Sequence, residues 1–244
     1  MLKKILKYSA LALVVCYIIF ALLIIPGKDD AELCNELIVN IDENNDMLSG
    51  TDVLTMLQDE GLDPRGKPLG EIKCFEIEHF MNSISLISSC QTYKTVNGNI
   101  VLEIDCRRPI LAVIGKDGEQ FCIDKDGAII EGIPSMLYLP LATGNITDSM
   151  ATAELKLIAE AIDNDRFWKA QTEQIYFDEN RNIILVPRVG NHIIELGTAD
   201  SIATKLENVK AFYGKGLNIV GWNKYSKLNA EYENRVICTK RNEN

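Results

Sequence analysis

The fold is decided by residues 87–107, which read ISSCQTYKTVNGNIVLEIDCR. Two runs with strand character, Ile87–Lys94 and Ile100–Arg107, flank the dipeptide Asn97-Gly98. Asn-Gly is strongly preferred in two-residue turns between antiparallel strands. The stretch therefore predicts a β-hairpin closed by a two-residue turn.

A strand and two short helices precede this hairpin. Leu37, Val39 and Ile41 alternate with polar residues, which indicates a half-buried strand. Ser49–Asp52 fits a capping box, a pattern that starts a helix. A second helix is indicated by apolar residues three and four positions apart, at Ile77, Phe80, Met81 and Ile84. This order predicts a small βααββ unit over residues 34–108, with both helices on one face of its sheet.

The rest of the chain, residues 109–244, is predicted to be mainly β with two helices, which makes the fold class α+β. The strands are expected at 111–114, 120–123, 128–130, 174–177, 183–187, 191–195 and 228–239. Helical spacing of apolar residues is seen at Leu155, Ile158, Ala159 and Ile162, and again at Ile202, Leu206 and Val209. Gly214 and Gly216 are expected to close the second helix.

The charge balance of the chain argues against a nucleic-acid partner. The 244 residues carry 25 Lys and Arg against 35 Asp and Glu, a net charge of −10. The only charged residues before position 28 are Lys3, Lys4 and Lys7, so the remainder is more acidic still. Such a surface repels both a phosphate backbone and anionic lipid, which leaves only the N-terminal end suited to a membrane.

Residues 8–25, YSALALVVCYIIFALLII, contain no charge. At about 1.5 Å per residue, a helix of this length just spans a bilayer core. The lysines before it predict a cytoplasmic tail over 1–7, a membrane helix over 8–25 and a linker over 26–33, with the C-terminal part in the periplasm. The competing interpretation is a cleaved signal peptide, which would have a shorter apolar run and a small-residue cleavage site. Neither is present.

No motif in the chain supplies catalytic machinery. Gly61–Lys67 has the glycine and lysine spacing of a phosphate-binding loop, but Pro68 stands where a hydroxyl is required. The two histidines, His79 and His192, are far apart in sequence and carry no ligand spacing. We expect no catalytic, metal or cofactor site. The cysteines outside the predicted membrane helix are either buried free thiols or partly paired, with Cys90 and Cys106 as the first candidate pair.

Nearly the whole chain resembles the FtsQ/DivIB family of bacterial cell-division proteins. The similarity rests on motifs in the family's order, namely Ile77-Glu78-x-x-Met81, Arg107-Arg108-Pro109-Ile110, Phe121-x-x-Asp124-x-x-Gly127, Leu139-Pro140-x-x-x-Gly144 and Tyr232-x-Asn234-x-Val236. The resemblance implies an anchor, a POTRA-like domain and a β domain. It also implies a non-enzymatic scaffold at the division septum of the inner membrane, which links early septal components to FtsB and FtsL and to septal peptidoglycan synthesis. Ala230, Glu231 and Glu233 depart from the family's pattern, which expects a larger apolar residue and basic ones there.

The last predicted strand, 228–239, is the expected partner site. Its apolar residues alternate with charged ones, and the chain ends soon after it, which suggests a strand at a sheet edge. The pattern alone fits either an edge that binds a partner strand or an edge whose charges prevent aggregation. The resemblance favours an FtsB-like partner, with the contacts at Trp222, Tyr225, Leu228, Tyr232, Glu233, Arg235 and Val236.

Two other functions stay open from the sequence. The chain could be a different membrane-anchored periplasmic interaction protein that carries a POTRA-like domain, with upstream partners bound through that domain. A cell-wall enzyme is the other alternative, and it would need an acid, base or nucleophile cluster that the sequence does not display. An assay of residues 28–244 on peptidoglycan separates the enzyme from the two binding proteins.

Overall fold

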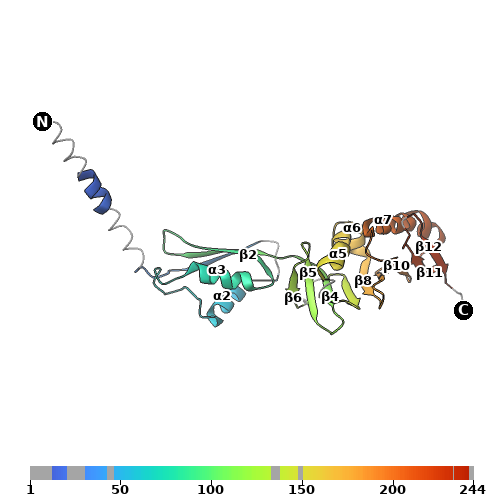
Figure 1. The fold of residues 1–244 in the computed structure, drawn as a ribbon, viewed down its shortest axis with the longest axis horizontal. Coiled ribbons are helices and arrows are strands. Elements are labelled where there is room, and N and C mark those ends of the chain that lie inside the picture. Colours follow the sequence, from blue (N-terminus) through green and yellow to red (C-terminus); the bar gives the residue numbers. More distant parts are fainter. Residues whose placement is uncertain are drawn as a thin grey trace, which may run out of the picture. The chain divides into compact units, whose positions relative to one another are not determined.

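The computed structural model of the protein describes residues 13–20, 31–42, 47–132, 138–147, 151–232 and 234–241. The chain forms two compact units that divide between Cys106 and Arg107 (Figure 1). Each unit has its own hydrophobic core. Residues 13–20, the described part of the predicted membrane span 8–25, are helical. Within the described ranges, no helix combines the length and the apolar character needed to cross a membrane. The predicted tail 1–7 and most of the predicted linker lie outside the described residues.

The first unit has the predicted order of strand, helix, helix, strand, strand. Its elements are β1 (Leu37–Ile41), α2 (Gly50–Asp59), α3 (Cys74–Ser83), β2 (Ile87–Lys94) and β3 (Ile100–Cys106). The central strand β3 runs parallel to β1 and antiparallel to β2. The core holds the buried residues of the two helices, Val53 and Leu57 from α2 and Ile77 and Met81 from α3.

Helix α2 begins at the predicted capping box. The Ser49 hydroxyl accepts a hydrogen bond from the backbone N–H of Asp52 at 3.2 Å, and the Asp52 carboxylate accepts one from the N–H of Ser49 at 2.9 Å. Two backbone donors at the helix start are thereby satisfied. The local sequence thus fixes where α2 starts, and this start orients Val53 and Leu57 toward the core.

The turn between β2 and β3 differs from the predicted two-residue turn. The N–H of Thr95 donates to the carbonyl of Asn99 at 2.8 Å, and the N–H of Gly98 donates to the carbonyl of Thr95 at 3.1 Å. Gly98 has a positive φ of 76°, whereas Asn97 does not have a positive φ. A type I′ turn needs a positive φ at both central residues, so the chain forms a longer loop that needs only one left-handed residue.

Cys90 and Cys106 are free thiols, so the predicted candidate disulfide is not formed. Cys90 lies opposite Ile104, and Cys106 lies opposite Ile87, which makes the two cysteines diagonal neighbours on adjacent strands. Diagonal positions in a sheet are about 7–8 Å apart, which is farther than a disulfide normally spans.

The second unit contains a nine-stranded sheet, ordered β12-β11-β10-β9-β8-β7-β4-β5-β6. Its strands are β4 (Pro109–Ile114), β5 (Gln120–Asp124), β6 (Ile129–Glu131), β7 (Leu141–Gly144), β8 (Thr172–Phe177), β9 (Ile183–Pro187), β10 (Ile193–Gly197), β11 (Tyr225–Asn229) and β12 (Ile237–Lys240). The short strand β7 was not predicted, because four residues carry too little periodicity. It nevertheless occupies a central place, since it pairs in parallel with both β4 and β8.

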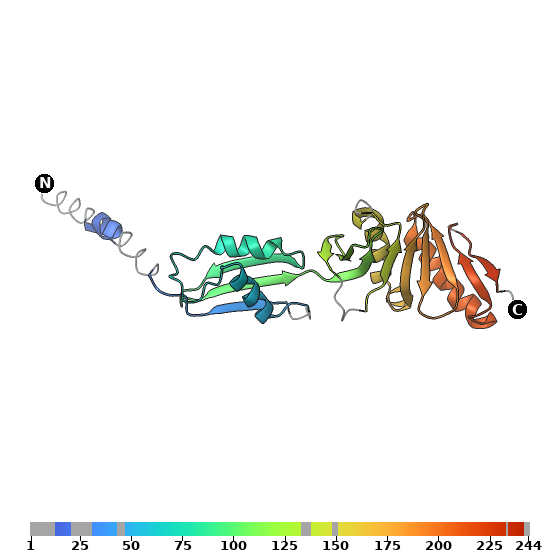
Figure 2. The same ribbon diagram turned by 90° about the horizontal axis from the view of Figure 1, so that it is seen from below.

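Helices of the second unit lie along one side of this sheet (Figures 1 and 2). They are the π-helical turn η2 (Ala151–Leu155), α5 (Lys156–Asp163), α6 (Arg166–Gln171), α7 (Ile202–Phe212), the π-helical turn η3 (Tyr213–Leu217) and α8 (Asn218–Val220). The prediction of two helices is correct for α5 and α7 but omits α6. Trp168 of α6 is only 1% exposed, and its indole N–H donates to the carbonyl of Leu206 at 3.2 Å. Helix α6 is thus held by tertiary contacts with α7.

Gly214 and Gly216 do not end the second predicted helix. The chain remains helical through η3 and α8 and stops at Gly221, whose φ is 95°. Tyr213 and Leu217, which flank the two glycines, are buried in the core and hold this turn in place. Gly216 is needed for packing, because a Cβ there would come within 2.6 Å of the Phe212 ring.

The predicted last strand, 228–239, is instead a hairpin of two strands. β11 and β12 are antiparallel, with Leu228 opposite Cys238, and the chain reverses between them. Glu231 N–H donates to the Asn229 side chain at 3.1 Å, as expected where a short amide side chain starts a turn. The sequence prediction was wrong here because alternation of apolar and polar residues continues through the loop, where Val236 still packs against the core.

Candidate partner-binding site

Strand β12 forms one edge of the nine-stranded sheet. On one side it pairs with β11, and β11 in turn pairs in parallel with β10. The edge strand therefore differs from the predicted one, since β11 has a neighbour on both sides. Ile237 is 48% exposed, and Thr239 and Lys240 are exposed as well, so side chains of the edge are accessible.

The backbone groups that face outward from β12 follow from its pairing. Arg241 N–H donates to the carbonyl of Lys224 at 3.0 Å, which directs the backbone of Arg241 toward β11. Backbone polar groups alternate in direction along a strand, and the register irregularity of this pair lies between Tyr225 and Lys227 of β11. Thr239 therefore also faces β11, whereas Cys238 and Lys240 direct their N–H and C=O groups away from it.

Three of the predicted site residues belong mainly to the core of the second unit. Leu228 is fully buried and lies between Ile194 and Cys238 of the neighbouring strands. The Trp222 indole packs edge-on against the Tyr213 ring at 4.9 Å and donates to Asn218. Tyr225 packs against the same core. Leu228 thus has a structural role, and Trp222 and Tyr225 expose only part of their side chains.

The other predicted site residues lie in the loop before β12. Tyr232 is 48% exposed, and the guanidinium of Arg235 lies over its ring at 4.8 Å. Arg235 is exposed too, whereas Val236 is half-buried against the core. Glu233 lies outside the described residues. The structure therefore brings Tyr232 and Arg235 together as an accessible cation–π pair next to the edge strand.

The C-terminal residue of the described chain holds this end of the sheet together. The Arg241 guanidinium donates to the carbonyls of Asn191 and Asn223, so it joins the loop before β10 to the segment before β11. Next to Asn191, the buried His192 makes a 2.7 Å hydrogen bond between its Nε2 and the Tyr213 hydroxyl. These contacts went unpredicted, because they join residues that lie 18 to 50 positions apart in sequence.

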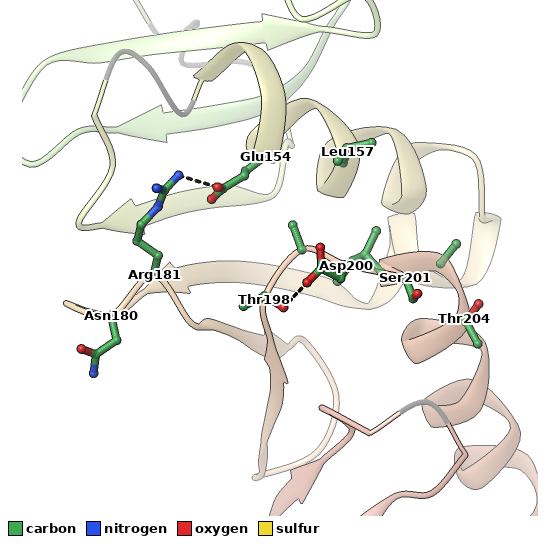
Figure 3. Close-up of a pocket in the computed structure, with 11 residues that line it drawn as sticks. Glu154, Leu157, Asn180, Arg181, Thr198, Asp200, Ser201 and Thr204 are labelled. Atoms are coloured by element: carbon green, nitrogen blue, oxygen red, sulfur yellow. Dashed lines mark hydrogen bonds and ion pairs between the residues drawn. The ribbon is translucent and has the colours of Figure 1, made fainter.

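A groove of about 750 Å³ lies at the start of α7, and no residue of β12 lines it (Figure 3). It is lined from three sides by Glu154 before α5, by Arg181 between β8 and β9, and by the loop that begins at Thr198. Arg181 pairs with Glu154, and the Thr198 hydroxyl donates to Asp200 at 2.9 Å. Each charged side chain of the groove thus has a partner within the lining, and the lining contains neither His nor Cys.

The cysteine thiols are poorly suited to act as nucleophiles. Burial raises the pKa of the Cys122 thiol to about 11, and burial is also the main cause of the raised pKa values of Cys74, Cys90 and Cys238. A thiol with a raised pKa is seldom ionised at neutral pH and is a poor nucleophile. In the part of the chain that the structure describes, no cluster of three or more His, Cys, Asp or Glu side chains could hold a metal ion.

Two family models match the chain, one on each unit. A model described as "FtsQ/DivIB, C-terminal related" matches residues 108–239, and a POTRA-like domain model matches residues 32–105. No curated protein matches the chain. The first model covers more than half of the sequence and includes the whole sheet that ends at β12, apart from its last residue. The chain therefore belongs to the FtsQ/DivIB family of non-enzymatic cell-division proteins.

Proposed function

We propose that this protein is a scaffold of the bacterial division machinery, anchored in the inner membrane through residues 8–25. Its N-terminus is in the cytoplasm and its two units are in the periplasm at the septum. It links early division proteins to an FtsB/FtsL-like complex and, through that complex, to septal peptidoglycan synthesis. Membership of the FtsQ/DivIB family supports this proposal, and so does the uncharged stretch that follows Lys3, Lys4 and Lys7.

The single observation that carries the partner site is the outer edge of β12, which pairs with no second strand among the residues that the structure describes. An extended segment of an FtsB-like protein can add a strand there, because Cys238 and Lys240 offer outward N–H and C=O groups. Exposed Ile237 supplies an apolar contact beside the edge, and the Tyr232–Arg235 pair supplies a polar one. The alternative, an edge protected only against aggregation, is supported by the short length of β12 and by Lys240.

Substitutions at Lys240 test which function the edge has. Lys240→Pro removes an N–H that faces away from β11, so the ladder between β11 and β12 stays intact. Lys240→Ala removes the side chain and keeps that N–H. We expect both full-length variants to fold, and only Lys240→Pro to weaken co-purification of the FtsB-like partner, by roughly tenfold for one lost hydrogen bond.

Thr239→Pro is the matched control for strand disruption. Its N–H faces β11, so we expect this variant to lose stability in urea unfolding, because a ladder hydrogen bond is lost. If Lys240→Pro is folded and binds the partner as tightly as Lys240→Ala does, the partner docks elsewhere and the edge is only protected.

The POTRA-like unit is proposed to recruit upstream division proteins. Deletion of residues 34–106 tests this role and leaves Arg107 with its partner in the second unit, because Arg107 pairs with Asp124. We expect the deleted protein to lose septal localisation while it keeps the FtsB-like partner. Septal foci of normal intensity from a stably expressed deletion would assign recruitment to another part of the chain.

A further inference from the structure

One end of the first unit gathers its exposed apolar side chains. Over residues 31–42 and 47–106, the large apolar residues that are exposed are Leu33, Phe75, Tyr93 and Val96. Phe75 is 75% exposed, and Val96 is fully exposed at the tip of the β2–β3 hairpin. Surface apolar residues that are scattered singly need no explanation, but a cluster at one end of a small domain indicates a contact surface.

Hydrogen bonds place Leu33 beside the hairpin tip. The Asn35 N–H donates to the carbonyl of Gly98 at 3.1 Å, and its side-chain amide donates to the carbonyl of Asn97 at 3.2 Å. Leu33 itself forms an isolated bridge with Pro68. The segment through which the chain enters the first unit thus lies against the tip that carries Val96.

Phe75 lies at the same end because α3 runs antiparallel to β2. The side chain of Asn82, late in α3, accepts from the backbone N–H of Cys90 at 2.8 Å. Glu78, one turn earlier, accepts from the N–H of Thr92 at 3.4 Å. The start of α3, which contains Phe75, therefore lies beside the end of β2. Figure 2 shows the helix running alongside the strands of the first unit.

The basic residues of the first unit lie near the same end as its exposed apolar residues. The first unit from residue 31 to residue 106 contains four of them, Arg65, Lys67, Lys73 and Lys94. Lys73 is the N-cap of α3 and Lys94 ends β2, while the carbonyl of Lys67 accepts from the N–H of Cys34 at 2.9 Å. Arg65 and Lys73 pair with Asp63 and Glu76, while Lys67 and Lys94 donate to backbone carbonyls. Within residues 31–42 and 47–106 the opposite end of the unit holds no basic residue, and the next basic residue along the chain is Arg107 of the second unit.

The short connection between the proposed anchor and the first unit indicates that this end of the unit faces the membrane. Residue 31 follows the last residue of the uncharged stretch, Ile25, by six positions, which allows a separation of at most about 20 Å. With the anchor of the proposed function in the bilayer, the end of the unit that carries residue 31 stays within that distance of the headgroups. The anchor makes the contact intramolecular, so a small apolar area is sufficient for it.

We propose that this end face rests on the periplasmic surface of the bilayer that holds the anchor. Leu33, Phe75 and Val96 enter the headgroup region, and the basic side chains around them lie at the level of the lipid phosphates. The inference rests on the proposed membrane anchor and adds a second contact with the same membrane.

Phe75→Trp in the full-length protein provides the test, because it replaces one aromatic ring with another. The protein is reconstituted into vesicles of phosphatidylethanolamine and phosphatidylglycerol, with or without bromine high on the acyl chains, and emission of the wild type is subtracted. We expect bromine to quench the added tryptophan roughly twofold, because the ring lies at the boundary of headgroups and acyl chains. Val96→Glu in the same protein should reduce this quenching, since it places a carboxylate on the contact surface.

Ser88→Trp is the matched control at the opposite end of the first unit, because Ser88 is exposed and lies about 20 Å along β2 from Lys94, which is beside the start of α3. Equal quenching at Phe75→Trp and Ser88→Trp, in protein that floats with the vesicles, would overturn the membrane contact while the anchor stands. Failure of the wild type to float with the vesicles would remove the anchor of the proposed function and this inference together.

Discussion

The Arg107 guanidinium donates to the Asp124 carboxylate at 3.0 Å, and Asp124 is only 3% exposed. The second carboxylate oxygen of Asp124 accepts from the backbone N–H groups of Asp126 at 2.9 Å and Ala128 at 2.8 Å. Asp124 therefore closes the β5–β6 turn and binds the residue that follows the first unit. The sequence motifs Arg107-Arg108-Pro109 and Asp124-x-x-Gly127 therefore form one structural feature, because Arg107 of the first forms an ion pair with Asp124 of the second.

Loss of this ion pair should destabilise the second unit. We expect Arg107→Ala to lower the free energy of unfolding by about 2 kcal/mol, because a buried carboxylate loses its charged donor. Urea unfolding of the wild type and the variant measures the change. Lys125→Ala, which removes an exposed ion pair with Asp126, serves as the control and should change stability by less than about 0.5 kcal/mol. Equal effects of the two substitutions would contradict a special role for Arg107.

Gly144 should tolerate no side chain. Its φ is 106°, and a Cβ at this position would lie 2.1 Å from the carbonyl oxygen of Phe177 on β8. We expect Gly144→Ala to lower the free energy of unfolding by about 3 kcal/mol or more, because the parallel pairing of β7 with β8 must shift. Gly118→Ala isolates the backbone strain, since Gly118 also has a positive φ but has open space around it. It should cost about 1–2 kcal/mol, and a similar loss at both positions would refute the steric argument.

The free energy of unfolding should decrease as the pH is lowered, because His192 is buried in its neutral form. Burial lowers the pKa of His192 below its ordinary 6.5, and the charge of Arg241 adds to the effect. His192 Nδ1 is buried and has no hydrogen-bond partner in the described part of the chain. In the unfolded chain His192 takes up a proton near pH 6.5, while in the folded chain it remains neutral, so its contribution to stability is lost as pH falls from above 6.5 through the lowered pKa.

Urea unfolding at pH 7.5 and at pH 5.5 measures this dependence. His192→Gln keeps a polar group near Tyr213 and does not titrate, so the difference between the two pH values should be smaller in the variant than in the wild type. The same pH dependence in both proteins would show that other groups cause it.

The orientation of the chain can be measured with a reporter enzyme. Alkaline phosphatase fused after Asn244 should be active, since it folds only where its disulfides form and the lysines before residue 8 predict a cytoplasmic N-terminus. A fusion at Lys7 should be inactive and provides the opposite control. An inactive but stably expressed fusion at Asn244 would reverse the proposed topology.

Much of the fold could be predicted from the sequence because its signals are local. The Ser49–Asp52 capping box starts α2, and the hairpin residues 87–106 form β2 and β3, since the chemistry of each signal lies within a few residues. The same locality explains the errors. Asn97-Gly98 favours a short turn, but the loop also bonds to Asn35, which lies 62 residues away in sequence.

The candidate site depended on tertiary structure to a greater degree. The sequence by itself determined that residues 227–232 alternate between polar and apolar residues and that Val236 and Cys238 continue the same phase. Only the tertiary structure decided that the chain reverses between Asn229 and Ile237, so that β11 is covered and β12 becomes the edge. A two-residue period specifies which face of a strand is buried, but the pairing of backbone groups with distant strands decides which strand remains unpaired.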